Sequence, residues 1–171
     1  MAEPTTAPLE PQRLTDDSRT FAERLFTWQP AWRDLARMAS RAGSDRYDLV
    51  VDVPSPIGDP SRGLQIWVDD DQLSVGFGEW HTHASLWRHE ARHGDERTAL
   101  LDLLAAIVAD QFVLTTDVGG EHDGDWGVLD LREPDALLES LTSPIYAPPR
   151  LRLRSWTGAA DAEVGPEDLR A

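Results

Sequence analysis

Residues 63–84 have the sequence GLQIWVDDDQLSVGFGEWHTHA, which shows the clearest local pattern in the chain. Apolar residues occupy every second position along 64–68 and again along 73–77, and three aspartates separate the two runs. Two alternating runs joined by a short polar cluster are typical of a β-hairpin. Because aspartate favours turns, the sequence predicts two antiparallel strands joined by a solvated acidic turn.

The same alternation, continued beyond Phe77, predicts that the second strand runs on through three chemically capable side chains. Strand side chains repeat every two residues, so Glu79, His81 and His83 would lie on the same face as Phe77. This face would be apolar along most of the strand and would end in a glutamate and two histidines. We therefore expect a pocket with polar side chains at the edge of a sheet.

Length and composition predict one soluble domain. The chain has 171 residues, of which 40% are hydrophobic, enough for one domain with a substantial core. No run of about 18 apolar residues occurs, so we expect no membrane span. The first residues, MAEPTTAPLEPQRL, are acidic and proline-rich, which argues against a signal peptide and favours a cytoplasmic location. Cysteine is absent, which excludes disulfides, thiolate catalysis and cysteine-ligated zinc.

The net charge is strongly negative, at −15 from 16 basic and 31 acidic residues. All of the basic residues are arginine, which we interpret as a GC-rich bacterial coding bias. Binding to a nucleic-acid backbone needs clustered lysine or arginine, so the acidity argues against a nucleic-acid partner. It fits a protein that docks on a basic protein partner.

The rest of the chain contains further periodic segments that predict the fold class. Apolar spacing predicts a long N-terminal helical segment from about Ser18 through the stripe formed by Trp32, Leu35, Ala36 and Ala39. The other expected elements are a strand at 46–53, a main helix at 96–108 capped by Asp95, a hairpin at 112–116 and 126–131, a short helix at 134–141 and a strand at 150–156. This order predicts an α+β fold on a largely antiparallel sheet of about five to six strands, with one main packed helix.

The expected division of the chain is a disordered arm at 1–16, a single domain at 17–157 and a weakly structured tail at 158–171. The hydrophobic core is predicted to contain apolar residues of the expected strands and of the main helix. These residues are Leu49, Val51, Leu64, Ile66, Val75, Phe77, Leu100, Leu103, Leu104, Ile107 and Leu129.

Two histidines one residue apart are a candidate metal site. His81 and His83 would project to one side of a strand, an arrangement that can bind zinc. Glu79 cannot join both histidines on one ion, because Glu79 and His83 would be roughly 13 Å apart at ~3.3 Å per residue. Candidates for the missing ligand, in order, are His122, His89 and Asp125. Because the spacing identifies no third ligand, we favour strand-end hydrogen bonding or partner binding and keep zinc as the alternative.

The segment HEARH at 89–93 matches the H-E-x-x-H pattern of zinc proteases. In that pattern a helix points both histidines toward one ion, and the glutamate serves as the base. Here Arg88 and Arg92 flank the motif, Gly94 follows it directly, and no apolar stripe accompanies it. No third ligand follows at the metzincin spacing. These departures from the pattern argue against a protease site, and we assign no catalytic residue to the chain.

The stretch VGFGEWHTHA at 75–84, followed by a predicted helix and by RSWTG at 154–158, resembles small acidic bacterial immunity proteins encoded beside polymorphic toxins. The resemblance covers roughly a third of the chain and carries over no functional residue. It implies a cytoplasmic inhibitor that binds a toxin domain, with its acidic surface facing a basic toxin.

Exposed acids and aromatic residues are the candidates for contacting such a partner, because charge complementarity favours binding and aromatic residues are enriched as interface anchors. These candidates are Asp69, Asp70, Asp71, Glu79, Trp80 and Trp87, with the acids at 123–125 as a further group. The function expected from the sequence is binding of a basic toxin domain. The alternative is a metal-dependent enzyme or a metal-binding protein that uses His81 and His83.

Overall fold

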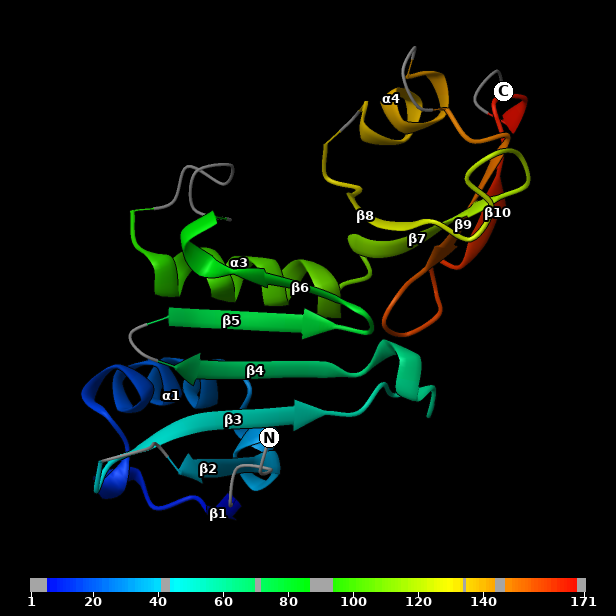
Figure 1. Cartoon of the computed structure of the whole chain (residues 1–171). Helices are drawn as coiled ribbons and strands as arrows, with labels where there is room; N and C mark the ends of the chain where they lie inside the picture. The colour runs from blue at the N-terminus through cyan, green and yellow to red at the C-terminus, as the bar shows by residue number, and fades with distance from the viewer. Residues whose placement is uncertain are drawn as a thin grey trace. The chain divides into compact units, whose positions relative to one another are not determined.

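The computed structural model describes residues 6–40, 44–69, 72–86, 94–133, 135–143 and 147–168 (Figure 1). The chain forms two compact units. The first unit contains residues 1–54 and 63–102, and the second contains 55–62 and 103–171. The sequence predicts a single domain at 17–157, and its periodicity gives no sign that a short internal segment, 55–62, joins the C-terminal part of the chain.

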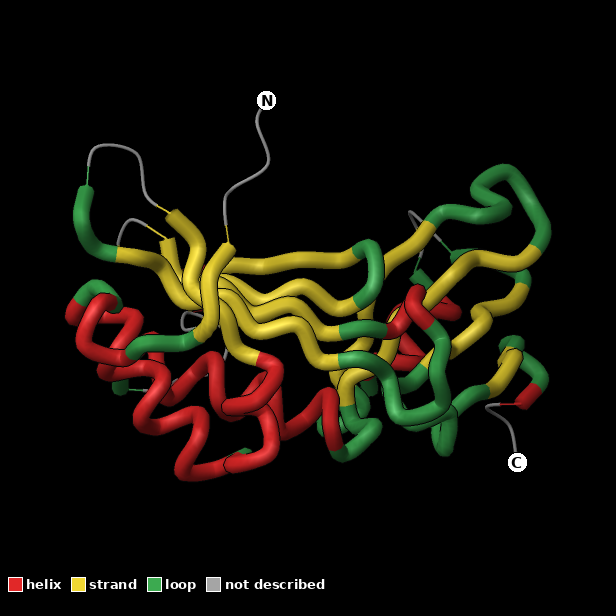
Figure 2. The backbone as a smooth tube through the Cα atoms, turned by 90° about the horizontal axis from the view of Figure 1, so that it is seen from below, coloured by secondary structure: helices red, strands yellow, loops and turns green. Residues whose placement is uncertain are grey.

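The first unit is built on a six-stranded antiparallel sheet in which each strand pairs with the next one in the sequence. The strands, in spatial order, are β1 (Thr6–Pro8), β2 (Ala36–Ser40), β3 (Tyr47–Val53), β4 (Leu64–Asp69), β5 (Gln72–Phe77) and β6 (Trp80–His83). Three helical segments precede β2, namely η1 (Pro11–Arg13), α1 (Asp16–Trp28) and η2 (Pro30–Leu35). Both α1 and η2 lie on one side of the sheet (Figures 1 and 2).

Strand alternation buries one face of this sheet. Val51, Ile66 and Val75 lie directly opposite one another on β3, β4 and β5, and all three are fully buried. Helix α1 contributes the buried Phe21 and Leu25. Helix α3 (Glu96–Val108) begins in the first unit and ends in the second. All eleven residues predicted for the core are buried, which confirms that prediction.

The second unit contains a four-stranded antiparallel sheet with the spatial order β10-β9-β7-β8. The strands are β7 (Phe112–Val118), β8 (Trp126–Asp130), β9 (Arg150–Arg154) and β10 (Ala162–Val164). Helix α4 (Ala136–Thr142) packs on this sheet, and the short helix η3 (Pro60–Arg62) lies in the 55–62 segment. The core of the unit is a cluster of Val113, Leu129, Leu141, Leu151 and Leu153.

The α+β class is confirmed, and the strands are divided between two antiparallel sheets instead of forming one. Both predicted hairpins form, because β4 pairs with β5 and β7 pairs with β8. The expected strands at 46–53 and 150–156 correspond to β3 and β9, and the expected main helix corresponds to α3.

The predicted helical stripe through 32–39 is wrong over its second half. The helix η2 ends at Leu35, and β2 follows, with Met38 opposite Leu49 of β3. Both side chains are fully buried, so pairing with a neighbouring strand outweighs the local helical spacing. The segments expected to be unstructured also contain strands, because β1 pairs with β2 and β10 pairs with β9.

The predicted continuation of the second hairpin strand to His83 is wrong. Strand β5 ends at Phe77, and Gly78 and Glu79 turn the chain back into β6. Gly78 has a φ of 58°, a left-handed conformation that glycine adopts without a Cβ clash. Its N–H donates to the carbonyl oxygen of Gly63 at 3.0 Å. A two-residue turn that begins with glycine fits a tight hairpin, so an antiparallel strand follows where the sequence predicted a continuation.

Candidate functional site

The turn after β5 places the histidines of β6 on the face opposite to the predicted one. His81 pairs with Gly76 and His83 pairs with Ser74. Directly paired residues share a face of the sheet, and this face is the one that does not carry Phe77. The expectation that both histidines lie on one side of a strand holds, but they do not extend the apolar face of β5.

The two imidazole rings are neighbours, with centroids 6.1 Å apart and planes at 74°. Nδ1 of His83 lies 2.8 Å from Oγ of Ser74, a hydrogen-bond distance. Because Ser74 is buried, this bond holds the His83 ring to strand β5. It also leaves Nε2 as the ring nitrogen of His83 that is directed toward other partners.

The described part of the chain supplies no third metal ligand to this pair. Within it, no three histidine, cysteine, aspartate or glutamate side chains gather closely enough to hold a metal ion. His122, the first candidate for the missing ligand, belongs to the second unit, where its Nδ1 lies 3.3 Å from Oδ2 of Asp125. His89 and the rest of the HEARH segment at 89–93 lie outside the described residues. Zinc binding stays a prediction.

Three of the residues predicted to contact a partner, Asp69, Glu79 and Trp80, lie in the described part of the first unit, and they do not form one patch. Asp69 ends β4, Glu79 lies in the turn after β5, and Trp80 begins β6. Asp69 and Glu79 are both exposed, but they lie at opposite ends of β5, about 17 Å apart at ~3.4 Å per residue. The remaining candidates, Asp70, Asp71 and Trp87, lie outside the described residues.

The longest stretch without arginine or lysine lies between Arg97 and Arg132, and seven acids occupy it. These are Asp102, Asp110, Asp117, Glu121, Asp123, Asp125 and Asp130. Four of them, from 117 to 125, belong to the end of β7 and the loop that joins it to β8. The acids at 123–125, a further group of expected partner contacts, are thus part of a much longer stretch without basic residues.

The β7–β8 loop holds its acids in a hydrogen-bonded conformation. The N–H of Gly119 donates to Oδ1 of Asp123 at 2.6 Å, and the N–H of Gly124 donates to the carbonyl oxygen of Asp117 at 3.0 Å. Every residue from 119 to 126 is exposed. Trp126, at the start of β8, is 53% exposed, so a large indole directly follows the acids. The loop therefore presents negative charge and an aromatic side chain together.

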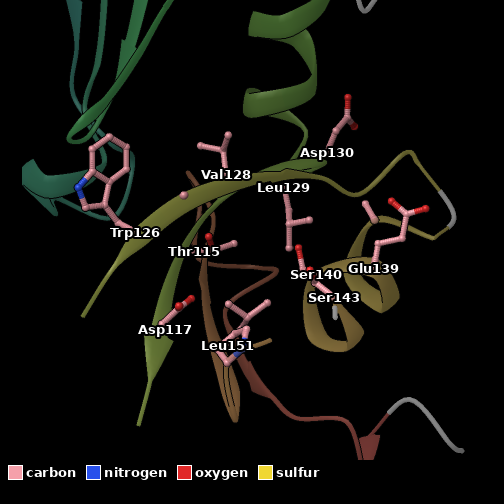
Figure 3. Close-up of a pocket in the computed structure, with 13 residues that line it drawn as sticks. Thr115, Asp117, Trp126, Val128, Leu129, Asp130, Glu139, Ser140, Ser143 and Leu151 are labelled. Carbon is pink, nitrogen blue, oxygen red and sulfur yellow. The ribbon is translucent and has the colours of Figure 1, made fainter. Parts of the chain in front are cut away.

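A pocket of about 540 Å³ opens between the four-stranded sheet and α4 (Figure 3). Its volume falls within the range of about 300–1,000 Å³ typical of small-molecule sites. Its lining includes Thr115, Asp117, Gly127, Leu129, Ser140 and Leu151. The sequence predicts no pocket from these residues, because they come from four elements that only the tertiary structure brings together.

Strand register explains which side chains face this pocket. Thr115 lies opposite Gly127 of β8 and Leu153 of β9, and Asp117 lies opposite Leu151. Thr115 and Asp117 therefore share one face of β7, and they are only 7% and 6% exposed. A Cβ added at Gly127 would lie 3.1 Å from Oγ1 of Thr115. Glycine at this position keeps the space beside the threonine hydroxyl open.

Helix α4 and the residues after it form the facing wall of the pocket. Figure 3 shows Leu129 on the side of β8 that faces Ser140 and Ser143. Val128 and Asp130 project from the other side of the same strand. The interior therefore combines hydroxyl groups with leucine side chains.

The pocket is acidic. Its lining within the described chain includes Asp117, Asp130 and Glu139 and contains no arginine, lysine or histidine. Burial acts to raise the pKa of Asp130, but the hydrogen bonds and charge of Arg132 outweigh it and hold this pKa below its usual value. Nη2 of Arg132 lies 2.6 Å from Oδ2 of Asp130. Asp130 is thus paired with Arg132 and projects from the other side of β8, so the negative charge of the lining comes from Asp117 and Glu139, which suits a ligand with positive charge.

Comparisons of the chain with protein-family models, curated proteins and solved structures found no match. Among the helices that the structure describes, none has both the length and the apolar character needed to cross a bilayer. Three features of the described chain are candidates for a functional role: the histidine pair of β6, the acidic β7–β8 loop with Trp126, and the acidic pocket beside α4.

Proposed function

We propose that the protein is a cytoplasmic, immunity-type protein that neutralises a basic toxin domain by binding it. The observation that carries this proposal is the β7–β8 hairpin, where a hydrogen-bonded acidic loop leads directly into Trp126. Tryptophan is enriched among the residues that contribute most to binding energy, and an exposed indole beside fixed negative charges suits a basic protein surface.

The distribution of charge supports a basic partner. The first unit contains 17 acidic and 10 basic residues, and the second contains 14 acidic and 6 basic residues. The net charges of −7 and −8 show that the acidity is shared by both units. A summed negative field of this kind accelerates encounter with a positively charged protein and opposes association with acidic ones.

Co-expression tests the proposal. A basic toxin domain encoded beside this gene would be produced in bacteria with the wild-type protein, with the Trp126→Ala variant or with the Leu138→Ala variant. Leu138 is 46% exposed on α4, so its truncation is a matched control that removes apolar surface elsewhere in the same unit. We expect the wild-type protein and Leu138→Ala to protect the cells and to co-purify with the toxin, whereas Trp126→Ala loses most of both.

Two outcomes would count against the proposal at different levels. Equal protection by all three proteins would exclude the β7–β8 hairpin as the contact surface. Undiminished toxicity in the presence of the wild-type protein, without co-purification, would reject toxin binding altogether.

A second candidate function is metal binding through His81 and His83. The observation that favours it is the distance of 6.1 Å between the centroids of two rings on β6, an edge strand of the sheet. Imidazole binds zinc at about 2.0–2.1 Å, so both rings would turn toward a common point. His83 would use Nε2 for the metal while Nδ1 keeps its bond with Ser74; in zinc sites the second ring nitrogen of a histidine ligand is commonly held by such a hydrogen bond.

Metal analysis of protein purified without a histidine tag tests this alternative. The wild-type protein and a His81→Ala/His83→Ala double variant would be loaded with zinc, desalted and measured for metal content. Stoichiometric zinc in the wild type that is lost from the double variant would support a metal site. A metal-free wild-type protein, or equal zinc in both proteins, would reject these two histidines as ligands.

A further inference from the structure

We propose that the pocket between the four-stranded sheet and α4 receives a guanidinium group, the head of an arginine side chain presented by the protein partner. The claim that a toxin supplies this arginine rests on the proposed function. The claim that the pocket binds a guanidinium rests only on the residues that line it.

The floor of the pocket carries the group that recognises the charge. Asp117 is 6% exposed, and Thr115 on the same face of β7 is 7% exposed. A carboxylate has about four lone-pair sites, so Asp117 can accept new donors in addition to the partners that it already has. A guanidinium offers five N–H donors in a planar fork, which matches a carboxylate and the neighbouring hydroxyl. Such charge-assisted hydrogen bonds are stronger than neutral ones.

The walls of the pocket favour arginine over lysine. Leu129 and Leu151 line the pocket together with Pro148, and Ser140 adds a hydroxyl from α4. A guanidinium is planar and weakly hydrated, so its faces can contact apolar side chains while its edges donate hydrogen bonds. The ammonium group of lysine is strongly hydrated and loses more on entering such a space.

The shape and charge of the pocket around Thr115 and Asp117 also favour a guanidinium group. Gly127 leaves the space beside Thr115 open, since a Cβ there would crowd the threonine hydroxyl. Glu139 on α4 adds negative charge to the lining, and the described lining contains no arginine, lysine or histidine that would compete with the incoming group. The exposed acids Glu121, Asp123 and Asp125 of the β7–β8 loop follow Asp117 in the chain and add to the negative field of this unit, which attracts a cationic side chain.

The test uses a small probe in place of the partner. N-acetyl-arginine methylamide would be titrated into the full-length ¹⁵N-labelled protein while amide chemical shifts are recorded. N-acetyl-citrulline methylamide, which has nearly the same shape without the charge, is the matched probe. We expect the arginine probe to produce saturable shifts at Thr115, Asp117, Gly127 and Ser140, and the citrulline probe to leave these amides unchanged. Equal responses to both probes, or no saturable shift at these residues, would overturn the proposal.

Two matched variants test whether the arginine probe binds at Asp117. Asp117→Asn and Glu133→Gln each remove one negative charge, but Glu133 is an exposed residue outside the pocket lining. We expect Asp117→Asn to weaken binding of the arginine probe by about tenfold, as loss of a charge-assisted bond implies, and Glu133→Gln to change it by less than about twofold. Equal weakening by both variants would show non-specific attraction and would overturn the proposal.

A pocket-filling variant covers the case in which Asp117→Asn does not fold. Ser140→Phe places a large side chain in the space while leaving Asp117 in place, and we expect it to abolish the saturable shifts. Retained shifts in a folded Ser140→Phe protein would contradict the proposed location.

The probe experiment needs no toxin, so a response to the arginine probe without protection of cells would support the pocket as a guanidinium site and reject the proposed function. Protection of cells without a response to the arginine probe would support the proposed function and reject the pocket as a guanidinium site.

Discussion

Arg62 and Asp161 form an ion pair in which Nη1 of the arginine lies 2.7 Å from both carboxylate oxygens. Arg62 is 9% exposed, and Nη1 also donates to the carbonyl oxygen of Ser155 at 2.9 Å. Its Nε donates to Oδ2 of Asp59 at 2.9 Å. These bonds attach the 55–62 segment, which lies between β3 and β4 in the sequence, to the chain that follows β9. They explain why this segment belongs to the second unit.

Replacing Arg62 with methionine should destabilise the protein by about 1–3 kcal/mol. The change keeps an unbranched side chain but leaves two carboxylates and the Ser155 carbonyl without their shared donor, and orphaned polar groups of this kind carry such costs. Urea unfolding of the two proteins measures the difference. Arg19→Met is the control, because its partner Asp16 is largely exposed and a surface pair contributes at most about 1 kcal/mol. Equal losses in the two variants would show that the Arg62 network is not a stabilising element.

The start of α3 predicts a pH-dependent contribution to stability. Asp95 accepts hydrogen bonds from the N–H and Oγ1 of Thr98 at 2.9 and 2.6 Å, and Nη1 of Arg24 lies 3.1 Å away. The bonds from Thr98, with a smaller effect of Arg24, lower the pKa of Asp95 from 3.8 to about 2. Because the folded pKa lies below the unfolded one, this stabilisation is complete above about pH 4 and is lost as the pH falls through about 2.

Asp95→Ala should cost about 1 kcal/mol at pH 7, the usual effect of losing a helix N-cap, and the difference should shrink between pH 4 and pH 2. Unfolding by urea at a series of pH values measures it. Asp135→Ala is the matched control, because Asp135 stands at the same position before α4 but makes no capping hydrogen bond. A pH-independent difference between wild type and Asp95→Ala would contradict the assignment of the cap.

The turn between β5 and β6 can be tested through Gly78. Its φ of 58° is left-handed, and an L-residue with a Cβ pays about 1–2 kcal/mol in this conformation. We expect Gly78→Ala to lower the free energy of unfolding by that amount. Gly94→Ala is the control, because Gly94 has no left-handed φ and a Cβ there meets no atom within 4 Å. Equal stability of the two variants would argue against a reversal of the chain at Gly78.

The sequence predicts secondary structure correctly where apolar residues repeat without interruption every two or every 3.6 residues, as in β4, β5 and α3. It fails where a single residue redirects the chain. Gly78 does not break the alternation of apolar residues, so the pattern could not distinguish a longer strand from a strand that turns back. Strand β2 was missed for a different reason, because Met38 is placed by pairing with Leu49, a contact that local spacing does not contain.

The candidate site was predictable only in part. The acids of the β7–β8 loop are adjacent in the sequence, and the exposed Trp126 follows them directly. The pocket could not be predicted, because Asp117, Gly127, Ser140 and Leu151 converge only through the order of strands in the second sheet and the position of α4. The buried positions of Thr115 and Asp117 depend on the same strand pairing.

Calorimetric titration of the full-length protein with the basic toxin domain encoded beside its gene is the most direct measurement of toxin binding through the β7–β8 hairpin. We predict a stoichiometric complex whose affinity falls as NaCl is raised from 50 to 300 mM, because the attraction between opposite charges is screened. We also predict that Trp126→Ala weakens binding by about tenfold or more, as expected for an interface anchor, and that Leu138→Ala does not. Absence of binding at micromolar concentrations, or binding that neither salt nor Trp126→Ala alters, would contradict the proposal.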